Sequence, residues 1–193
     1  MFEFIKGEVS ELTPTAVILE LNGLGYEIQI SLYSYSSLQK VDNCRMYVHQ
    51  VIREDAHILY GFVSKEEREI FRLLISVSGV GANTARVILS SMSPQEVRNA
   101  ISSGNDELLR GIKGIGVKSA QRIIVDLKDK VGKVGEPSEI FRPADNTNKK
   151  EALSALEVLG FSKKQSEKIV DKLLSVDGSL SVEELIKQAL KLL

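Results

Sequence analysis

The feature that most constrains this chain is an internal repeat of a glycine-containing segment in its middle third. Residues 74–88 align with residues 109–123 at a constant offset of 35, with identical residues at five positions and aliphatic residues in both copies at two more. In each copy an apolar run ends in Gly-aliphatic-Gly and a second apolar run begins at once. Duplication of one supersecondary unit explains the pattern, and each unit is predicted to be two helices joined by a tight turn.

The two glycine turns are candidate phosphate-binding sites. Glycines let the backbone turn sharply and approach another molecule closely, and the next helix begins with unpaired N–H groups and a partial positive charge. Such a nest of N–H groups suits a phosphate. The candidate DNA-binding residues are Gly79, Val80, Gly81, Gly114, Ile115 and Gly116, together with Lys118 and Arg122, which lie four apart on one helical face.

The glycines have two other interpretations. A glycine between two helices is most often only a cap and turn. A P-loop is disfavoured because Lys118-Ser119 falls one residue late for that motif and no strand precedes it. Duplication with basic residues behind the second copy favours DNA instead, since the repeat resembles the helix-hairpin-helix DNA-binding motif.

Charge becomes informative only when it is divided along the chain. The formal net charge of -1 would not suggest a nucleic-acid partner. Residues 1–62 hold 4 basic and 8 acidic side chains, residues 63–133 hold 12 and 8, and residues 134–193 hold 9 and 10. The segment charges of -4, +4 and -1 therefore place a basic middle behind an acidic first part.

The first part, residues 1–62, is predicted to be a small antiparallel β-barrel or sandwich. Strand-like runs at 16–21 and 26–30 flank Asn22-Gly23, a dipeptide that tolerates positive φ, and further β-rich runs follow at 46–52 and 56–60. The pattern predicts a hairpin followed by additional strands.

The rest of the chain is predicted to be helical with one interruption. From Ser64 onward the apolar period is 3.6, so residues 63–131 are assigned to the helical repeat domain. Residues 132–147 contain Pro, Gly and a polar run and are expected to be a flexible linker. Residues 148–193 are expected to form a compact three-helix domain. Capping boxes are predicted at Ser64/Glu67, Ser93/Glu96, Ser162/Gln165 and Ser181/Glu184.

Other chemistry-bearing residues are sparse. Glu54 and Asp55 could form a metal or acid/base site, but no third ligand is close in sequence, and a solvated turn is the plain alternative. Cys44 is the single cysteine, so no internal disulfide or cysteine-based zinc site is expected, which argues for a reducing compartment. No membrane segment, cofactor, metal site or catalytic residue is expected, and a cytoplasmic location is predicted.

These features together resemble one family. An acidic barrel with Arg-Glu-Asp-Ala at 53–56 and Leu-Tyr-Gly-Phe at 59–62, then tandem helix-hairpin-helix units, a linker and a small helical domain, is similar to the RuvA family. Its members are the Holliday-junction-recognition subunits of the bacterial branch-migration complex in recombination and DNA repair, within the SOS response to DNA damage. The likeness covers essentially the whole chain.

The resemblance implies an α+β multidomain architecture that begins with an OB-fold barrel. It implies a non-catalytic subunit that binds four-way junction DNA by shape and phosphate contacts, as a homotetramer or an octamer. Glu54 and Asp55 match the acidic pin at the tetramer centre. The implied protein partners are the RuvB motor, which supplies ATP hydrolysis, and the RuvC resolvase. Leu156, Leu159, Phe161 and Leu190 match the positions that dock RuvB, with a plain core role as the alternative.

The chain departs from the family pattern at three positions. Asn83 stands where Lys is frequent, Val117 where a basic residue is frequent, and Lys113 where Pro is frequent. Two other function classes remain open at this point. One is a helix-hairpin-helix DNA glycosylase or lyase that uses Asp126. The other is a protein-interaction adaptor that does not bind DNA.

Overall fold

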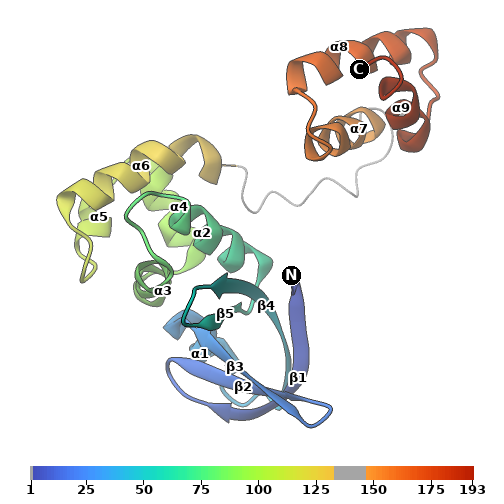
Figure 1. Cartoon of the computed structure of the whole chain (residues 1–193). Coiled ribbons are helices and arrows are strands. Elements are labelled where there is room, and N and C mark those ends of the chain that lie inside the picture. The colour runs from blue at the N-terminus through green and yellow to red at the C-terminus, as the bar shows by residue number, and fades with distance from the viewer. Residues whose placement is uncertain (1, 133–146) are drawn as a thin grey trace. The chain divides into compact units, whose positions relative to one another are not determined.

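The computed structural model describes residues 2–132 and 147–193, so nearly all of the predicted linker at 132–147 lies outside the described residues (Figure 1). The chain divides into two compact units near residue 135. The first unit contains both the barrel and the glycine repeat, and the second is helical. Within the described ranges, the helices are too short or too polar to cross a membrane.

The first unit begins with a closed five-stranded barrel. Its strands run in the order β1-β2-β3-β5-β4, with β3 and β5 parallel and the other neighbours antiparallel. This small closed barrel with a helix after its third strand is consistent with the expected OB-fold. Its elements are β1 Phe4–Leu12, β2 Ala16–Leu21, β3 Leu24–Ile30, α1 Leu32–Leu38, β4 Asn43–Ile52 and β5 His57–Phe62.

The predicted hairpin is present as β2 and β3. Asn22 and Gly23 have φ values of 51° and 79°, the two positive values that a type I′ turn requires. Alternation then sends Val17, Leu19 and Ile28 into the barrel core, where each is fully buried. The sequence pattern did not predict β1 or α1, because neither carries a clean apolar alternation or helical period.

The helical part of the first unit packs around a single core. Its elements are α2 Lys65–Ile75, α3 Ala82–Ser91, α4 Pro94–Ser103, α5 Asp106–Arg110 and α6 Val117–Val131. Phe71 of α2 contacts Tyr60 and Phe62 of β5, with ring centroids 5.2 and 4.8 Å apart. The end of the last strand therefore belongs to the helical core, and the barrel is packed directly against the repeat.

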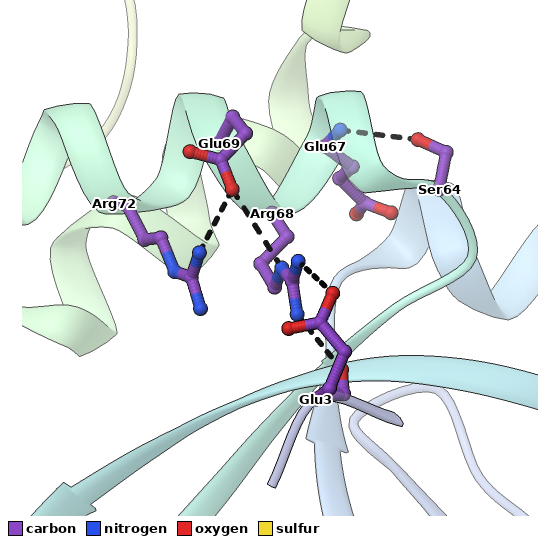
Figure 2. A network of polar contacts seen from close by, with 6 residues as sticks. All are labelled: Glu3, Ser64, Glu67, Arg68, Glu69 and Arg72. Carbon is purple, nitrogen blue, oxygen red and sulfur yellow. Dashed lines mark hydrogen bonds and ion pairs between the residues drawn. The ribbon is translucent and has the colours of Figure 1, made fainter. Parts of the chain in front are cut away.

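A buried arginine also joins the barrel to the repeat. Arg68 of α2 is 3% exposed, and its guanidinium donates to the Glu3 backbone oxygen at 2.8 Å and to the Glu3 carboxylate at 2.7 Å (Figure 2). The same guanidinium lies over the Tyr47 ring, 5.4 Å from its centroid. Because Glu3 directly precedes β1, this contact fixes the first strand against α2.

Glu67 of α2 forms a second contact between the helical part and the barrel, and its side chain does not have the role that the sequence predicts. Ser64 does cap α2 by accepting from the Glu67 N–H at 3.0 Å, but the Glu67 side chain does not complete the capping box. It is fully buried and accepts from Ser31 Oγ at 2.5 Å, Ser34 Oγ at 2.8 Å and the Val63 N–H at 3.2 Å. Burial raises the pKa of Glu67, although these three hydrogen bonds oppose the rise.

The raised pKa predicts how Glu67 affects stability. Its stabilising contribution is fully present below the unfolded value near 4.5 and is lost as the pH rises through the higher folded value. Glu67→Gln keeps a neutral hydrogen-bonding group, so the stability of this variant relative to the wild type should increase from pH 4.5 to pH 8. Glu67→Ala should lose about 1–3 kcal/mol because the buried hydroxyls of Ser31 and Ser34 lose their acceptor.

Urea unfolding followed by tyrosine fluorescence measures both effects, because the five tyrosines lie between residues 26 and 60 and the chain has no tryptophan. Glu107→Gln is the control, since the Glu107 side chain is 83% exposed. A pH-independent difference between Glu67→Gln and the wild type would contradict the proposed titration.

The second unit is a three-helix domain made of α7 Thr147–Val158, α8 Lys163–Val176 and α9 Val182–Ala189. Ser181 and Glu184 form the predicted capping box at the start of α9. The box predicted at Ser162 is wrong, because the Ser162 hydroxyl donates to the Gln165 side chain and no side chain caps α8. Leu156, Val170 and Leu185 are fully buried at the centre of the unit.

Candidate nucleic-acid interface

The two copies of the repeat fold into the same turn. In the first, the Val77 N–H donates to Leu74 O at 3.1 Å and the Val80 N–H donates to Val77 O at 3.0 Å. In the second, 35 residues later, the Ile112 N–H donates to Leu109 O at 3.2 Å and the Ile115 N–H to Ile112 O at 3.0 Å. The duplication seen in the sequence is therefore a duplication of backbone geometry.

The first glycine of each turn has a conformational reason. Gly79 and Gly114 have φ values of 89° and 92°, in the left-handed region that side chains rarely adopt. Glycine at these positions lets each α-helix end in a turn that leads directly into the next helix.

The second glycine of each turn is required neither by its backbone conformation nor by contacts with the residues that the structure describes. Gly81 and Gly116 have φ values of -84° and -82°, which any residue adopts, and a Cβ atom at either would meet nothing within 4 Å. Both are N-caps, and neither α3 nor α6 receives a side-chain cap. The first-turn N–H groups of both helices therefore face outward without an acceptor among the described residues.

The side chains of Val80 and Ile115 lie inside the helical domain. Their side chains are only 5% and 6% exposed and belong to the core of the helical domain. Their N–H groups donate within the turn, to Val77 and Ile112. The groups of each turn that remain free to meet a ligand therefore include the N–H groups of the first helical residues.

The predicted cations of the second hairpin lie at the surface. Lys118 is exposed and has no hydrogen bond or ion pair within the described ranges. The Arg122 side chain is 57% exposed, and its Nε lies 4.0 Å from an Asp126 carboxylate oxygen. Arg122 Nη1 also donates to the Ser78 backbone oxygen at 3.4 Å, so Arg122 reaches from the second hairpin to the loop of the first.

In the first hairpin the cation, Arg86, lies at a different position from the cations of the second hairpin. Asn83 occupies the position that corresponds to Lys118, and its side-chain oxygen accepts from Arg86 Nη2 at 3.0 Å. Arg86 Nη1 donates to Gln29 at 2.5 Å and to the Thr15 backbone oxygen at 3.2 Å. The arginine of this hairpin is thus directed toward the barrel, a role that the sequence analysis missed because its partners are 57 and 71 residues away.

The predicted acidic pair lies at the tip of the turn between β4 and β5. Glu54 and Asp55 are both exposed, and the Arg53 N–H donates to Ala56 O at 2.8 Å to close the turn. Neither carboxylate takes part in an ion pair with the residues that the structure describes. Both carboxylates therefore face solvent. In the same described residues, groups of three or more His, Cys, Asp or Glu suited to a metal are absent.

The four apolar residues assigned to partner docking divide into two pairs. Leu159 and Leu190 are 57% and 42% exposed, so they are available at the surface. Leu156 has no exposed surface, and Phe161 packs against the same core. The assignment of Leu156 to direct docking is therefore corrected: it stabilises the unit, since a side chain without exposed area cannot contact a partner.

Comparison with known proteins decides the family. The model of the RuvA N-terminal domain matches residues 1–61, that of the SAM-like helix-hairpin-helix tandem matches 71–129, and that of the RuvA C-terminal domain matches 147–193. The Holliday junction branch migration complex subunit RuvA of Christiangramia forsetii is 52% identical over 191 residues, which cover 99% of both chains. The chain belongs to the RuvA family. The RuvA subunits of Flavobacterium psychrophilum and Bacteroides fragilis are 51% and 49% identical, again over 99% of both chains.

Membership of the RuvA family accounts for the order of the parts: barrel, paired hairpins and C-terminal three-helix unit. It leaves the alternative of a glycosylase or lyase without support, because that alternative did not explain the barrel. Asp126, the residue proposed for that chemistry, lies on α6 beside Arg122 and has a side chain that is 41% exposed.

Proposed function

We propose that this protein is the junction-binding subunit of a branch-migration complex. It holds a four-way DNA junction by phosphate contacts and itself catalyses no reaction. It would act beside DNA in the bacterial cytoplasm, in recombination and DNA repair. Family membership supports the assignment, since the relatives carry the name Holliday junction branch migration complex subunit RuvA.

One observation carries the DNA-binding part of this proposal. Gly81 and Gly116 are two N-caps with ordinary φ values, open space around them and outward N–H groups, 35 residues apart in equivalent turns. Nothing among the residues that the structure describes requires glycine there, whereas a phosphate that approaches the backbone closely does. The exposed Lys118 and Arg122 add charge beside the second of these turns.

The acidic turn supplies discrimination between DNA structures. Four subunits around one junction would bring eight carboxylates of Glu54 and Asp55 to its centre, where they repel phosphates and disfavour a continuous duplex. A homotetramer, or two tetramers face to face, follows from the family resemblance and is part of the proposal.

The C-terminal unit is proposed to bind the RuvB motor, which would supply ATP hydrolysis. The support is the pair of exposed leucines, Leu159 and Leu190, in a unit whose core is already complete without them. The RuvC resolvase is proposed to act on the same junction.

The proposal is tested by comparing binding to a four-way junction and to linear duplex of equal length. The wild type should prefer the junction. The variant Gly81→Ser with Gly116→Ser should bind about tenfold or more weakly, because serine at an N-cap accepts from the N–H groups that a phosphate would use.

The same substitution separates binding from folding, since serine is a favourable N-cap and should leave helix stability equal or higher. Gly132→Ser is the matched control, because Gly132 also has open space and an ordinary φ of -62° but lies at the far end of α6. Unchanged junction affinity in the double variant would contradict the phosphate assignment.

A further inference from the structure

A cleft on the outer surface of the barrel lies between the first hairpin and the acidic turn. It has a volume of about 570 Å³ and is lined by residues of β3, β5 and α3 together with Arg53 of the β4–β5 turn. The cleft runs along β5 from His57, beside the turn, to Tyr60. Tyr60 lies opposite Gln29 in the parallel pairing of β5 with β3. A volume of this size holds a small organic ligand rather than a single ion.

The cleft has a positive charge in an otherwise acidic domain. Arg53, His57 and Arg86 line it, and Glu27 is its one carboxylate. Glu27 accepts from the Gln29 side-chain amide at 3.1 Å, so part of its hydrogen-bonding capacity is used. Arg53 and His57 have exposed side chains with no hydrogen bond or ion pair in the described ranges. Two arginines and a histidine against one carboxylate suit an anionic ligand.

Arg86 is held in place for such a ligand. Its contacts with Thr15, Gln29 and Asn83 fix the guanidinium at the cleft wall and use only part of its five N–H donors. Asn83, which replaces the cation expected beside the first glycine turn, is one of the three residues that orient it. The first hairpin thus has no cation at the position that corresponds to Lys118. Its Arg86, about one helical turn later, lines the cleft instead.

The remaining lining is suited to a base. Ile58 and Leu59 provide apolar surface, and the amides of Gln29 and Asn83 together with Glu27 provide hydrogen-bond donors and acceptors. A paired base hides its hydrogen-bonding edge and stacks within the duplex, so only an unpaired nucleotide can offer both a phosphate and a free base edge here.

We propose that this cleft binds one unpaired nucleotide of a DNA strand, with its phosphate on Arg53, His57 and Arg86, where strands separate beside the acidic turn. This rests on the proposed function, since the unpaired nucleotide is supplied by the junction. The first glycine turn, the cleft and the acidic turn would then guide one strand from the duplex arm toward the junction centre.

The test uses the full chain and the variant Arg53→Gln with His57→Gln. Both side chains are exposed and have no partner among the described residues, so folding should be unchanged. Binding is measured to a four-way junction and to linear duplex, and 2-aminopurine next to the crossover reports base unstacking at saturating protein. We expect junction affinity to fall about tenfold or more, as for loss of one charged hydrogen bond. Duplex affinity should stay unchanged, and the 2-aminopurine signal should be smaller.

Lys6→Gln is the matched control, because Lys6 is an exposed cation of the barrel that lies far from the acidic turn. In the strand register Lys6 of β1 lies opposite Arg45 of β4, which is seven residues before Ile52 at the turn end of that strand. Equal losses on junction and duplex would mean that the cleft contacts duplex backbone, and unchanged binding would mean that it contacts no DNA. Either result overturns the proposal while leaving the function intact.

Two further results distinguish this proposal from a site for free nucleotides and from a failure of the proposed function. Deoxyadenosine monophosphate should bind the full chain only at millimolar concentration, and micromolar binding would instead identify a site for free nucleotides. A wild type that does not prefer the junction would overturn the proposed function, and the cleft proposal with it.

Discussion

Replacing Lys118 and Arg122 together with alanine is expected to weaken junction binding at moderate salt by at least the order of 100-fold, the loss from one engaged subunit. Each side chain would contribute one charged phosphate contact of about 1.5 kcal/mol, and the two together about 3 kcal/mol. The plot of log affinity against log salt should become less steep by about two units for each subunit that engages the DNA, because each lost phosphate contact removes about 0.9.

The structural reason for the expected loss of affinity is that neither cation has a strong partner among the residues that the structure describes. Lys118 is unpartnered among the described residues, and Arg122 lies at 4.0 Å from Asp126 and 3.4 Å from Ser78 O, both long contacts. Their substitution should leave the free energy of unfolding nearly unchanged, since exposed pairs of this kind contribute little.

The matched control is Lys128→Ala with Lys130→Ala, which removes the same charge from the same helix. Lys130 lies twelve residues from Lys118, or about 18 Å along α6. If the control lowered the salt slope as much as the test variant, bulk charge rather than phosphate contact at the second hairpin would explain the effect.

Neutralising the acidic turn with Glu54→Gln and Asp55→Asn is expected to raise affinity for linear duplex about tenfold relative to the junction. The side chains are isosteric with the originals, and the turn is closed by a backbone hydrogen bond between Arg53 and Ala56, so its shape should be retained. What changes is charge: a tetramer would lose eight carboxylates from the surface that repels a continuous duplex.

Competition between labelled junction and unlabelled duplex measures this ratio directly. Glu8→Gln with Glu11→Gln is the control, because it removes the same charge from exposed positions on β1. The proposed role would be refuted by an unchanged ratio, or by an equal change in the control, which would point to the net charge of the barrel.

Local features of the fold could be predicted from the sequence. The turn at Asn22-Gly23 follows from two adjacent residues that tolerate positive φ, and the paired hairpins follow from a spacing of 35 that repeats glycines and apolar positions together. Such signals need only neighbouring residues, since backbone sterics and apolar periodicity act within a few positions.

Features that depend on distant residues were missed. Ser31 and Glu67 are 36 positions apart, and Glu3 and Arg68 are 65 apart. Glu67 was interpreted as half of a local capping box, and only its burial against α1 shows that it joins two domains. The docking residues show the same limit: Leu156 and Leu159 look alike in sequence, but one is fully buried and the other is 57% exposed.

The sequence by itself determined the repeat, the glycine turns, the division of charge and the family resemblance, because each is carried by residue types at fixed spacings. Only the tertiary structure decided which groups of each hairpin are free to bind and where Arg86 points. It also decided that a cationic cleft connects the first hairpin to the acidic turn. The physical reason is that burial and charge-to-charge distance are set by packing between β3, β5 and α3, segments that the chain order keeps far apart.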